Sequence, residues 1–371
     1  MALITYTVLA PIVGGLIDRF GPRRVIGPGI LVLTVGLILC SLVNTLIQFY
    51  LLYGVIIGAG VTCISIVPYT ALFGHWFEKK RGLASGIAVS GMGLGIFLFV
   101  PLSQYFIALW GWRPAFVILG VLVLIVLFPL NVILLRHKPQ ELGLLPDGLY
   151  VVQSSNGKKI EEDSKGCAEN DWTIQRALRE RSFWAFIVFP FLVTIGVYFI
   201  LVHHVKFLVD IGIDKMTAAF IFGFIGVISS CFRIFWGWLS DHIGREKTYS
   251  MGLICMCLGV GSLLLIDTSD EKCLVYAFFI FFGIGWGVTA PIFMAAAADL
   301  FRGRIFGLIY GIVEGCVGVG GALGSWIGGY VFDTTQSYQW AFILAIAMFL
   351  LSGIFIWIAA PRKIHKKGYT R

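Results

Sequence analysis

Apolar residues recur along the chain in blocks of roughly 20, and short stretches rich in charged and polar side chains separate the blocks. An α-helix needs about 20 apolar residues to cross a hydrocarbon core about 30 Å thick, and it satisfies its backbone hydrogen bonds internally. The pattern therefore predicts an all-α, polytopic membrane protein with eleven spanning helices. Their approximate ranges are 2–17, 25–43, 47–73, 83–109, 113–135, 183–206, 216–240, 247–266, 273–298, 304–331 and 339–360.

Composition agrees with this pattern. Hydrophobic residues make up 58% of the 371 residues, charged residues make up only 13%, and the mean hydropathy is +0.90. A soluble core of this size could not bury so much apolar surface. The blocks are also much longer than the strands of about 10 residues that build an outer-membrane barrel.

The net charge of +8 would favour a nucleic-acid partner in a soluble protein. Here 23 of the 28 lysines and arginines fall in alternate loops and in the stretch after residue 360. By the positive-inside rule, this placement predicts that those loops and the C-terminus face the cytoplasm. The charges therefore indicate orientation in a cytoplasmic membrane, and no nucleic-acid partner is expected.

An internal repeat divides the chain. The run GGLIDRFGPRR at 14–24 returns as GWLSDHIGREK at 237–247, and Arg81-Gly82-Leu83 has a later counterpart in Arg304 and Gly307-Leu308. We predict an N-terminal half over 1–135, a cytoplasmic linker over 136–181, and a C-terminal half with a tail over 182–371. Subtracting the repeat offset of 223 from the 183–206 block gives negative positions, so the first helix of the first half is expected to be missing.

The repeated run and the plan of six plus six helices resemble the major facilitator superfamily. Within it, the second half is similar to the monocarboxylate and oxalate/formate transporter branches, through 198–203, FRIFWG at 232–237, DLF at 299–301 and WFEKKRG at 76–82. The resemblance implies a bundle of two halves, with eleven of twelve helices present and the substrate held between the halves. It implies a secondary transporter without a cofactor, and no enzyme.

The repeated run has the chemistry of a gate. Its glycines allow close helix packing, and a carboxylate at a helix end can meet the positive N-terminus of another helix. The resemblance implies a cytoplasmic clasp in which the arginines pair with acids opposite; the alternative is that the charges only end helices and set topology. The candidate gate residues are Asp18, Arg19, Gly21, Arg23, Asp241 and Arg245.

Two charged residues lie within predicted spans. Arg233 is about 12 Å and Glu314 about 15 Å from their cytoplasmic helix ends, at 1.5 Å per residue. A charge at that depth needs a partner or a water-filled cavity. The resemblance implies that Arg233 binds a substrate carboxylate, whereas the competing hypothesis is a structural Arg233–Glu314 ion pair.

Glu314 departs from the oxalate transporters, which carry a lysine at this place. A glutamate argues against oxalate and suits either a monocarboxylate with a titrating proton site or a cationic or zwitterionic substrate. Tyr69, Tyr198 and Trp286 are candidates to line an apolar cavity for a short organic acid, although lipid contact or core packing would also account for each ring.

We therefore expect a monomeric secondary transporter in a lipid bilayer that moves a small organic anion, a monocarboxylate, with protons. The alternatives are an exporter of drugs or other amphiphilic molecules, or a truncated membrane protein that does not transport. The sequence contains no Walker A run and no metal-binding or nucleophile motif within the spans, which argues against ATP drive and against an enzyme.

Overall fold

The computed structural model describes residues 1–136, 139, 144, 146–148, 172–266, 271–301, 303 and 305–359, without the side chains of Val100 and Ala219. The N-terminal helices are α1 (Ala2–Phe20), α2 (Pro22–Cys40), α3 (Leu46–Phe49), the π-helix η1 (Tyr50–Ile57), α4 (Gly58–Cys63), α5 (Ile66–Trp76), α6 (Arg81–Trp110) and α7 (Trp112–Leu134). The later helices are a 3₁₀ turn η3 (Pro146–Gly148), α8 (Ile174–Arg179), α9 (Arg181–Asp210), α10 (Lys215–Ile243), α11 (Arg245–Leu264), α12 (Lys272–Trp286), α13 (Thr289–Leu300), α14 (Phe306–Thr335) and α15 (Gln339–Ala359). Most of the predicted linker, Arg302, Arg304 and the tail from 360 lie outside the described residues.

Eleven helices in the described part of the chain are long and apolar enough to cross a membrane, which confirms the predicted number. Two of these spans are composite. Leu46–Trp76 joins α3, η1, α4 and α5, and Lys272–Leu300 joins α12 and α13. The blocks read from the sequence therefore correspond to spans, but two of them conceal a break in the helix.

Both breaks come just before a proline. Pro68 and Pro291 are separated by the repeat offset of 223, and each is the third residue of its helix, α5 or α13. Proline is tolerated in the first turn because the amide hydrogen that it lacks would have no partner within the helix. The composite spans are thus related by the repeat.

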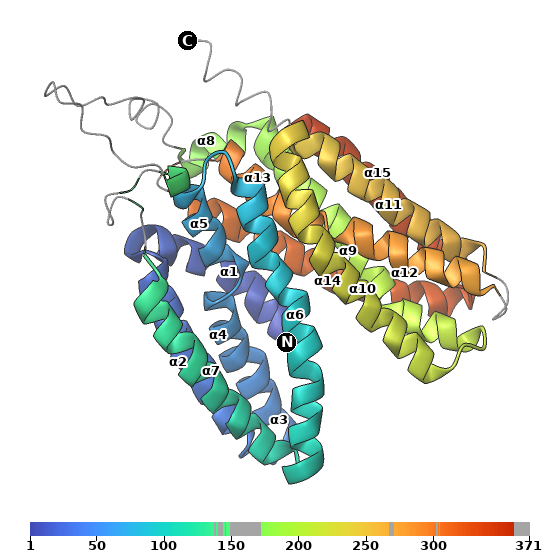
Figure 1. Cartoon of the computed structure of the whole chain (residues 1–371), viewed down its shortest axis with the longest axis horizontal. Helices are drawn as coiled ribbons and strands as arrows, with labels where there is room; N and C mark the ends of the chain where they lie inside the picture. Colours follow the sequence, from blue (N-terminus) through green and yellow to red (C-terminus); the bar gives the residue numbers. More distant parts are fainter. Residues whose placement is uncertain are drawn as a thin grey trace, which may run out of the picture.

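The helices form two groups, α1–α7 and α9–α15, which converge at the end of the bundle near α8 (Figure 1). The main contacts between the groups are those of α1 with α14 and of α6 with α10. At this end α1 and α10 finish while α6 and α14 begin, and we call it the clasp end.

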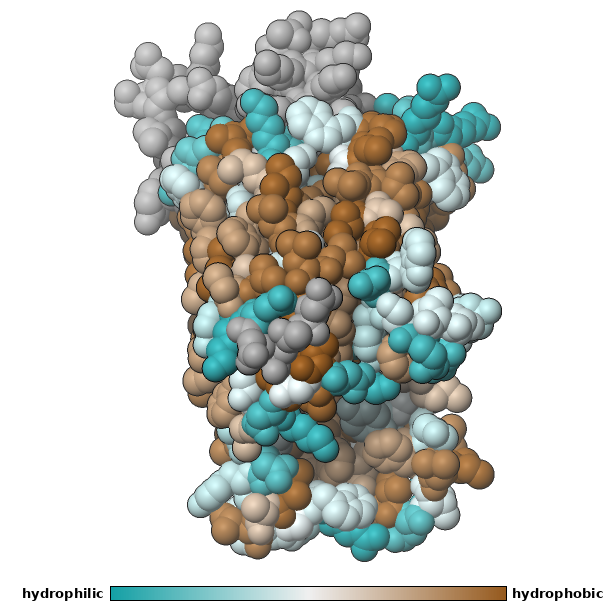
Figure 2. All heavy atoms as spheres, turned by 90° about the vertical axis from the view of Figure 1, so that its right-hand side faces the viewer, coloured by the Kyte–Doolittle hydropathy of each residue, from teal (hydrophilic) through white to brown (hydrophobic). Residues whose placement is uncertain are grey.

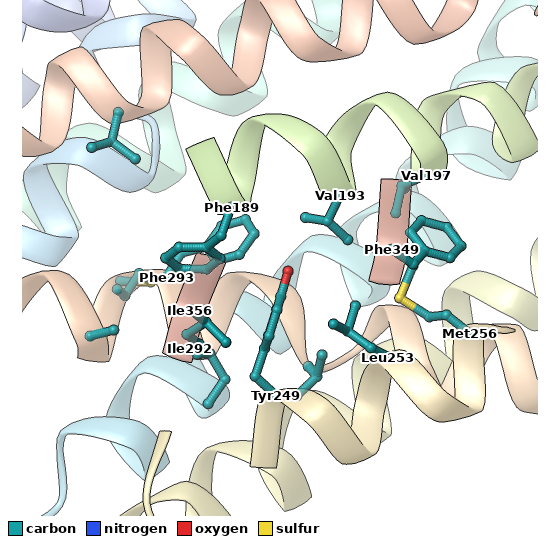
Figure 3. Packing of buried hydrophobic residues seen from close by; sticks show 14 of the residues in the cluster. Phe189, Val193, Val197, Tyr249, Leu253, Met256, Ile292, Phe293, Phe349 and Ile356 are labelled. Atoms are coloured by element: carbon teal, nitrogen blue, oxygen red, sulfur yellow. The ribbon is translucent and has the colours of Figure 1, made fainter. Parts of the chain in front are cut away.

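Apolar side chains from four helices make the core of the second group. Phe189 and Val193 on α9 meet Tyr249 on α11, Phe293 on α13 and Phe349 on α15 (Figure 3). The Tyr249 and Ser352 hydroxyls are 2.6 Å apart, and Ser352 donates to the Phe189 carbonyl at 2.7 Å. The hydroxyl groups of Tyr249 and Ser352 are therefore paired within this core, as burial favours.

The outer surface is apolar as well. Figure 2 shows hydrophobic residues covering much of one side of the molecule, with hydrophilic ones at its upper corners and scattered over its middle and lower parts. Large apolar side chains that a soluble protein would bury are exposed, among them Ile125, Ile133, Leu134, Trp326 and Leu350. Such a surface matches a lipid environment.

Glycines allow the two groups to touch. A Cβ atom on Gly14 of α1 would overlap the Gly307 carbonyl of α14, and one on Gly237 of α10 would overlap the Gly82 carbonyl of α6. Gly14 and Gly237 are equivalent in the repeat, since their offset is 223. Backbone-to-backbone packing of this kind is typical of small residues at membrane helix contacts.

We expect Gly14→Ala and Gly237→Ala each to destabilise the protein by about 1–3 kcal/mol, because the added methyl group forces the helices apart. Gly261→Ala on α11 is the control, since its Cβ would meet nothing within 4 Å. The control should leave the thermal unfolding midpoint unchanged or slightly higher, because alanine favours helix. Equal midpoints for all three variants in detergent would contradict the close packing.

Candidate functional site

Two aspartates connect the helix groups at the clasp end. The Asp18 carboxylate at the end of α1 accepts hydrogen bonds from the Gly307 and Leu308 amides of α14, at 2.7 and 2.8 Å. The Asp241 carboxylate of α10 accepts from the first-turn amides of α6, those of Gly82 and Leu83, both at 2.9 Å. Each carboxylate therefore caps a helix of the opposite group, where free amides and the helix dipole favour negative charge.

The glycine after each of these helices has a conformational role. Gly21 ends α1 with φ of 81°, and Gly244 ends α10 with φ of 98°. This left-handed region is strained for residues that carry a Cβ atom. Both glycines let the chain turn directly into the next helix, so the aspartate lies in the last turn of its own helix.

Only one of the clasps includes ion pairs between described residues. Arg245 contacts Asp241 at 2.6 Å and Asp299 at 3.0 Å, while Asp299 also pairs with Arg81 at 2.8 Å. These four side chains are 2–12% exposed. Arg81 belongs to the first helix group and the other three to the second, so the ion pairs connect the groups as the Asp241 cap does.

The remaining gate candidates lie beside the clasps. Arg19 is exposed and its guanidinium is 5.1 Å from the centre of the Phe20 ring, and it makes no ion pair with a described residue. The expected pairing of Arg19 with an opposing acid is therefore absent from the described part of the chain. Arg23 donates to the Val132 carbonyl at 2.6 Å and thereby connects α2 with α7 inside one group.

Arg233 is buried, at 5% exposure, on the side of α10 that faces α6. One terminal nitrogen donates to the Val89 carbonyl at 2.9 Å and to the Met92 sulfur at 3.2 Å, while Nε has no hydrogen-bond partner among the described residues. The guanidinium lies 5.5 Å from the centre of the Trp286 ring. Arg233 pairs with no described carboxylate, so the structural Arg233–Glu314 ion pair does not form here.

Glu314 lies where α14 faces α1, and it is 5% exposed. Its carboxyl group accepts a hydrogen bond from the Tyr6 hydroxyl of α1 at 3.0 Å. Tyr310 is fully buried one helical turn before it. Glu314 forms no ion pair within the described residues, so tyrosines and not cations surround the carboxyl group.

The predicted aromatic residues occupy different environments. Trp286 stacks with Arg233, and Tyr198, which is 36% exposed, covers Gly321 of α14. Tyr69 on α5 is half-buried against the main hydrophobic core. The structure therefore associates Trp286 with Arg233, whereas it places Tyr198 over Gly321 of α14 and Tyr69 against the core.

Sequence reasoning missed the partners of both buried charges. Tyr6 is one of 13 tyrosines and occurs in no motif, and the partner of Arg233 is a backbone carbonyl, which every residue has. The repeat does relate the two helix contacts that hold these charges. Val89 on α6 is equivalent to Glu314 on α14, at an offset of 225, and Ala10 on α1 is equivalent to Arg233 on α10, at an offset of 223. The α6–α10 contact, with Arg233, is thus the repeat equivalent of the α1–α14 contact, with Glu314.

Comparisons with known proteins agree on one family. Residues 1–312 match the Major Facilitator Superfamily profile. Monocarboxylate transporter 13 of Bos taurus is 28% identical over 354 residues, covering 95% of this chain and 76% of the relative. Monocarboxylate transporter 2 of Homo sapiens is 26% identical over 363 residues, covering 92% of this chain and 73% of the relative.

A solved structure shares the arrangement of helices. A variant of the fucose:proton symporter of E. coli superposes with a TM-score of 0.72 at 14% identity, covering 96% of this chain and 88% of that one. At this identity the likeness concerns the fold alone. It confirms the predicted all-helical, major-facilitator-like bundle.

Removal of either clasp carboxylate should open the clasp end. We expect Asp18→Ala and Asp241→Ala to speed thiol labelling of a Ser85→Cys probe, which is 2% exposed below the clasp, in a background without native cysteines. Asp241→Ala should have the larger effect, because breaking a buried ion-pair network costs about 3–5 kcal/mol against about 1 kcal/mol for a lost cap.

The control is Asp214→Ala. Asp214 also accepts from two amides, those of Met216 and Thr217, but it caps its own helix α10. This variant should lose about as much capping free energy as Asp18→Ala, but the Ser85→Cys probe should not be labelled faster. Equal labelling rates in all three variants would show that the clasps do not close this end.

Proposed function

The chain belongs to the major facilitator superfamily, and from this premise we propose that it carries a small organic monocarboxylate across the cytoplasmic membrane with protons. Members of the superfamily are secondary transporters and not enzymes, so the chain is a multi-pass membrane transporter.

Arg233 carries the substrate proposal. A buried guanidinium retains its charge, and in the bilayer interior a charge is costly without a counter-ion or water. Among the described residues Arg233 contacts a carbonyl, a thioether and an indole ring, but no carboxylate. A substrate carboxylate would supply the missing anion, and a planar guanidinium can bind its two oxygens together.

The relatives support this substrate class. The Bos taurus and Homo sapiens proteins are named monocarboxylate transporters. The buried carboxyl group of Glu314 would repel a second substrate carboxylate when ionised. Both observations favour a substrate with one carboxylate over a dicarboxylate.

The placement of charge supports the proposed orientation. Arg19, Arg24, Lys79 and Lys80 lie at the end of α1, the start of α2 and just before α6, hence at the clasp end, which the positive-inside rule places in the cytoplasm together with the C-terminus. The two halves, 1–135 and 182–371, would then move as units joined by the linker 136–181, in a monomer. In this orientation, the two aspartate caps at the clasp end would close the protein toward the cytoplasm.

Glu314 is the proposed proton site. Its carboxyl group is titratable and buried, and it accepts a hydrogen bond from the opposite helix group through the Tyr6 hydroxyl. A neutral carboxylic acid is compatible with this environment, and an ionised one would lack a cation among the described residues. A proton bound at Glu314 would thus be carried together with the negatively charged substrate bound at Arg233.

The substrate role of Arg233 is tested with Arg233→Gln in proteoliposomes. Uptake of radiolabelled lactate or pyruvate should fall by at least about 30-fold, since truncating one member of a buried charge pair costs about 2–5 kcal/mol. Lys215→Gln removes an exposed charge at the other end of α10 and should retain uptake. Full uptake by a folded Arg233→Gln protein would refute the assignment.

The coupling role of Glu314 is tested with Glu314→Gln. This variant should still exchange labelled for unlabelled monocarboxylate across the membrane, but an imposed pH gradient should no longer drive accumulation. Asp333→Asn, which neutralises an acid near the far end of the same helix, is the control and should accumulate substrate normally. Gradient-driven accumulation by Glu314→Gln would place the proton site elsewhere.

A further inference from the structure

We propose that α8 and the start of α9 form a binding site for the headgroups of anionic phospholipids, and that occupancy of this site stabilises the closed clasp. Helix α8 lies at the clasp end of the bundle, beside the end of α13 (Figure 1). It is a feature separate from the proposed substrate site, because α8 packs against α9, and the residue before its cap packs against Phe301.

The segment carries exposed cations. Arg176, Arg179 and Arg181 are all exposed, and none of them makes an ion pair with a described residue. Glu180 is the one acidic residue within 172–184, which leaves this stretch with an excess of positive charge. Such juxtamembrane basic groups attract anionic lipids at the surface of a bilayer.

Exposed apolar groups accompany these cations. Ile174 is 43%, Leu178 46% and Trp184 51% exposed, and the Trp184 indole donates to the Leu178 carbonyl at 2.9 Å. These apolar side chains would not contribute to binding a free anion in water. The boundary between headgroups and acyl chains, in contrast, accepts apolar side chains and favours tryptophan. The combination of charge and apolar exposure therefore points to a lipid and not to a soluble anion.

The helix is fixed in place by its other side. The Thr173 hydroxyl caps α8 by accepting from the Arg176 amide at 3.3 Å, and Ala177 is buried against the bundle. The Trp172 ring lies 5.2 Å from the Phe301 ring, and the Arg176 guanidinium lies 5.2 Å from the Trp172 ring. One basic side chain of the site thus contacts the residue that anchors the site.

Phe301 provides the connection to the clasp. It is fully buried, and it also packs against Phe183 and Phe186 of α9 at 5.8 and 5.4 Å between ring centres. Two residues earlier, Asp299 pairs with Arg245 and with Arg81 of the other helix group. A headgroup that restrains α8 would restrain Trp172, and through Phe301 the chain segment that presents Asp299.

The experiment compares the protein in nanodiscs of phosphatidylcholine with and without about 30% phosphatidylglycerol. With the anionic lipid, the unfolding midpoint should rise by about 4 °C, as expected when a ligand binds only the folded state. Labelling of the Ser85→Cys probe from the clasp end should slow at the same time. Inorganic phosphate at equal concentration should change neither quantity.

The triple variant Arg176→Gln, Arg179→Gln, Arg181→Gln should lose more than half of both effects. Lys215→Gln with Lys272→Gln, at the opposite end, is the matched control and should retain them. If the triple variant does not fold, Arg179→Gln alone should lower the midpoint shift measurably. An undiminished shift in the arginine variants, an equal response to phosphate, or no lipid response of the unmodified protein would overturn the proposal.

Discussion

The packing of the two helix groups against each other depends on two carboxylates, each of which caps a helix of the opposite group. The first-turn amides of α6 and α14 have no acceptor in their own helices, and an unpaired amide is costly away from water. Asp241 and Asp18 supply acceptors from the opposite group. Because these bonds exist only while the halves meet at the clasp end, helix capping and conformational closure are the same interaction in this molecule.

The repeat produces two aspartate clasps, but within the described residues the two clasps differ in their charged side chains. At the repeat offset of 223, the positions equivalent to Arg245 and Asp299 in the first half are Pro22 and Trp76, and neither of these residues carries charge. The α6–α10 side therefore gains the ion pairs among Arg81, Asp241, Arg245 and Asp299. Within the described residues, the α1–α14 side depends on amide hydrogen bonds and close glycine packing.

The same two helix contacts position the buried charges. Further along each contact from the clasp, Arg233 meets the Val89 carbonyl of α6, and Glu314 meets the Tyr6 hydroxyl of α1. Each charge thus lies in the second half and bonds to the first. A movement that separates α10 from α6 and α14 from α1 at this depth would break both bonds.

Local sequence determined the spans, the repeat and the identity of the charged residues. Runs of about 20 apolar residues specify spanning helices because the bilayer leaves the backbone no alternative. The repeated run placed an aspartate and a following glycine at two helix ends and, through its family resemblance, marked Asp18 and Asp241 as candidates for a clasp. The positions of Pro68 and Pro291 carried a signal for the helix breaks as well.

Only the tertiary structure decided which groups meet. The partner of Asp18 lies 289 residues away, that of Arg233 is a carbonyl with no sequence signature, and that of Glu314 is an isolated tyrosine. It also decided that Arg233 and Glu314 do not pair, and that Arg19 faces outward. Such pairings depend on how the helices rotate and cross, and the hydropathy of a helix limits these angles only weakly, because lipid and neighbouring helices are similarly apolar.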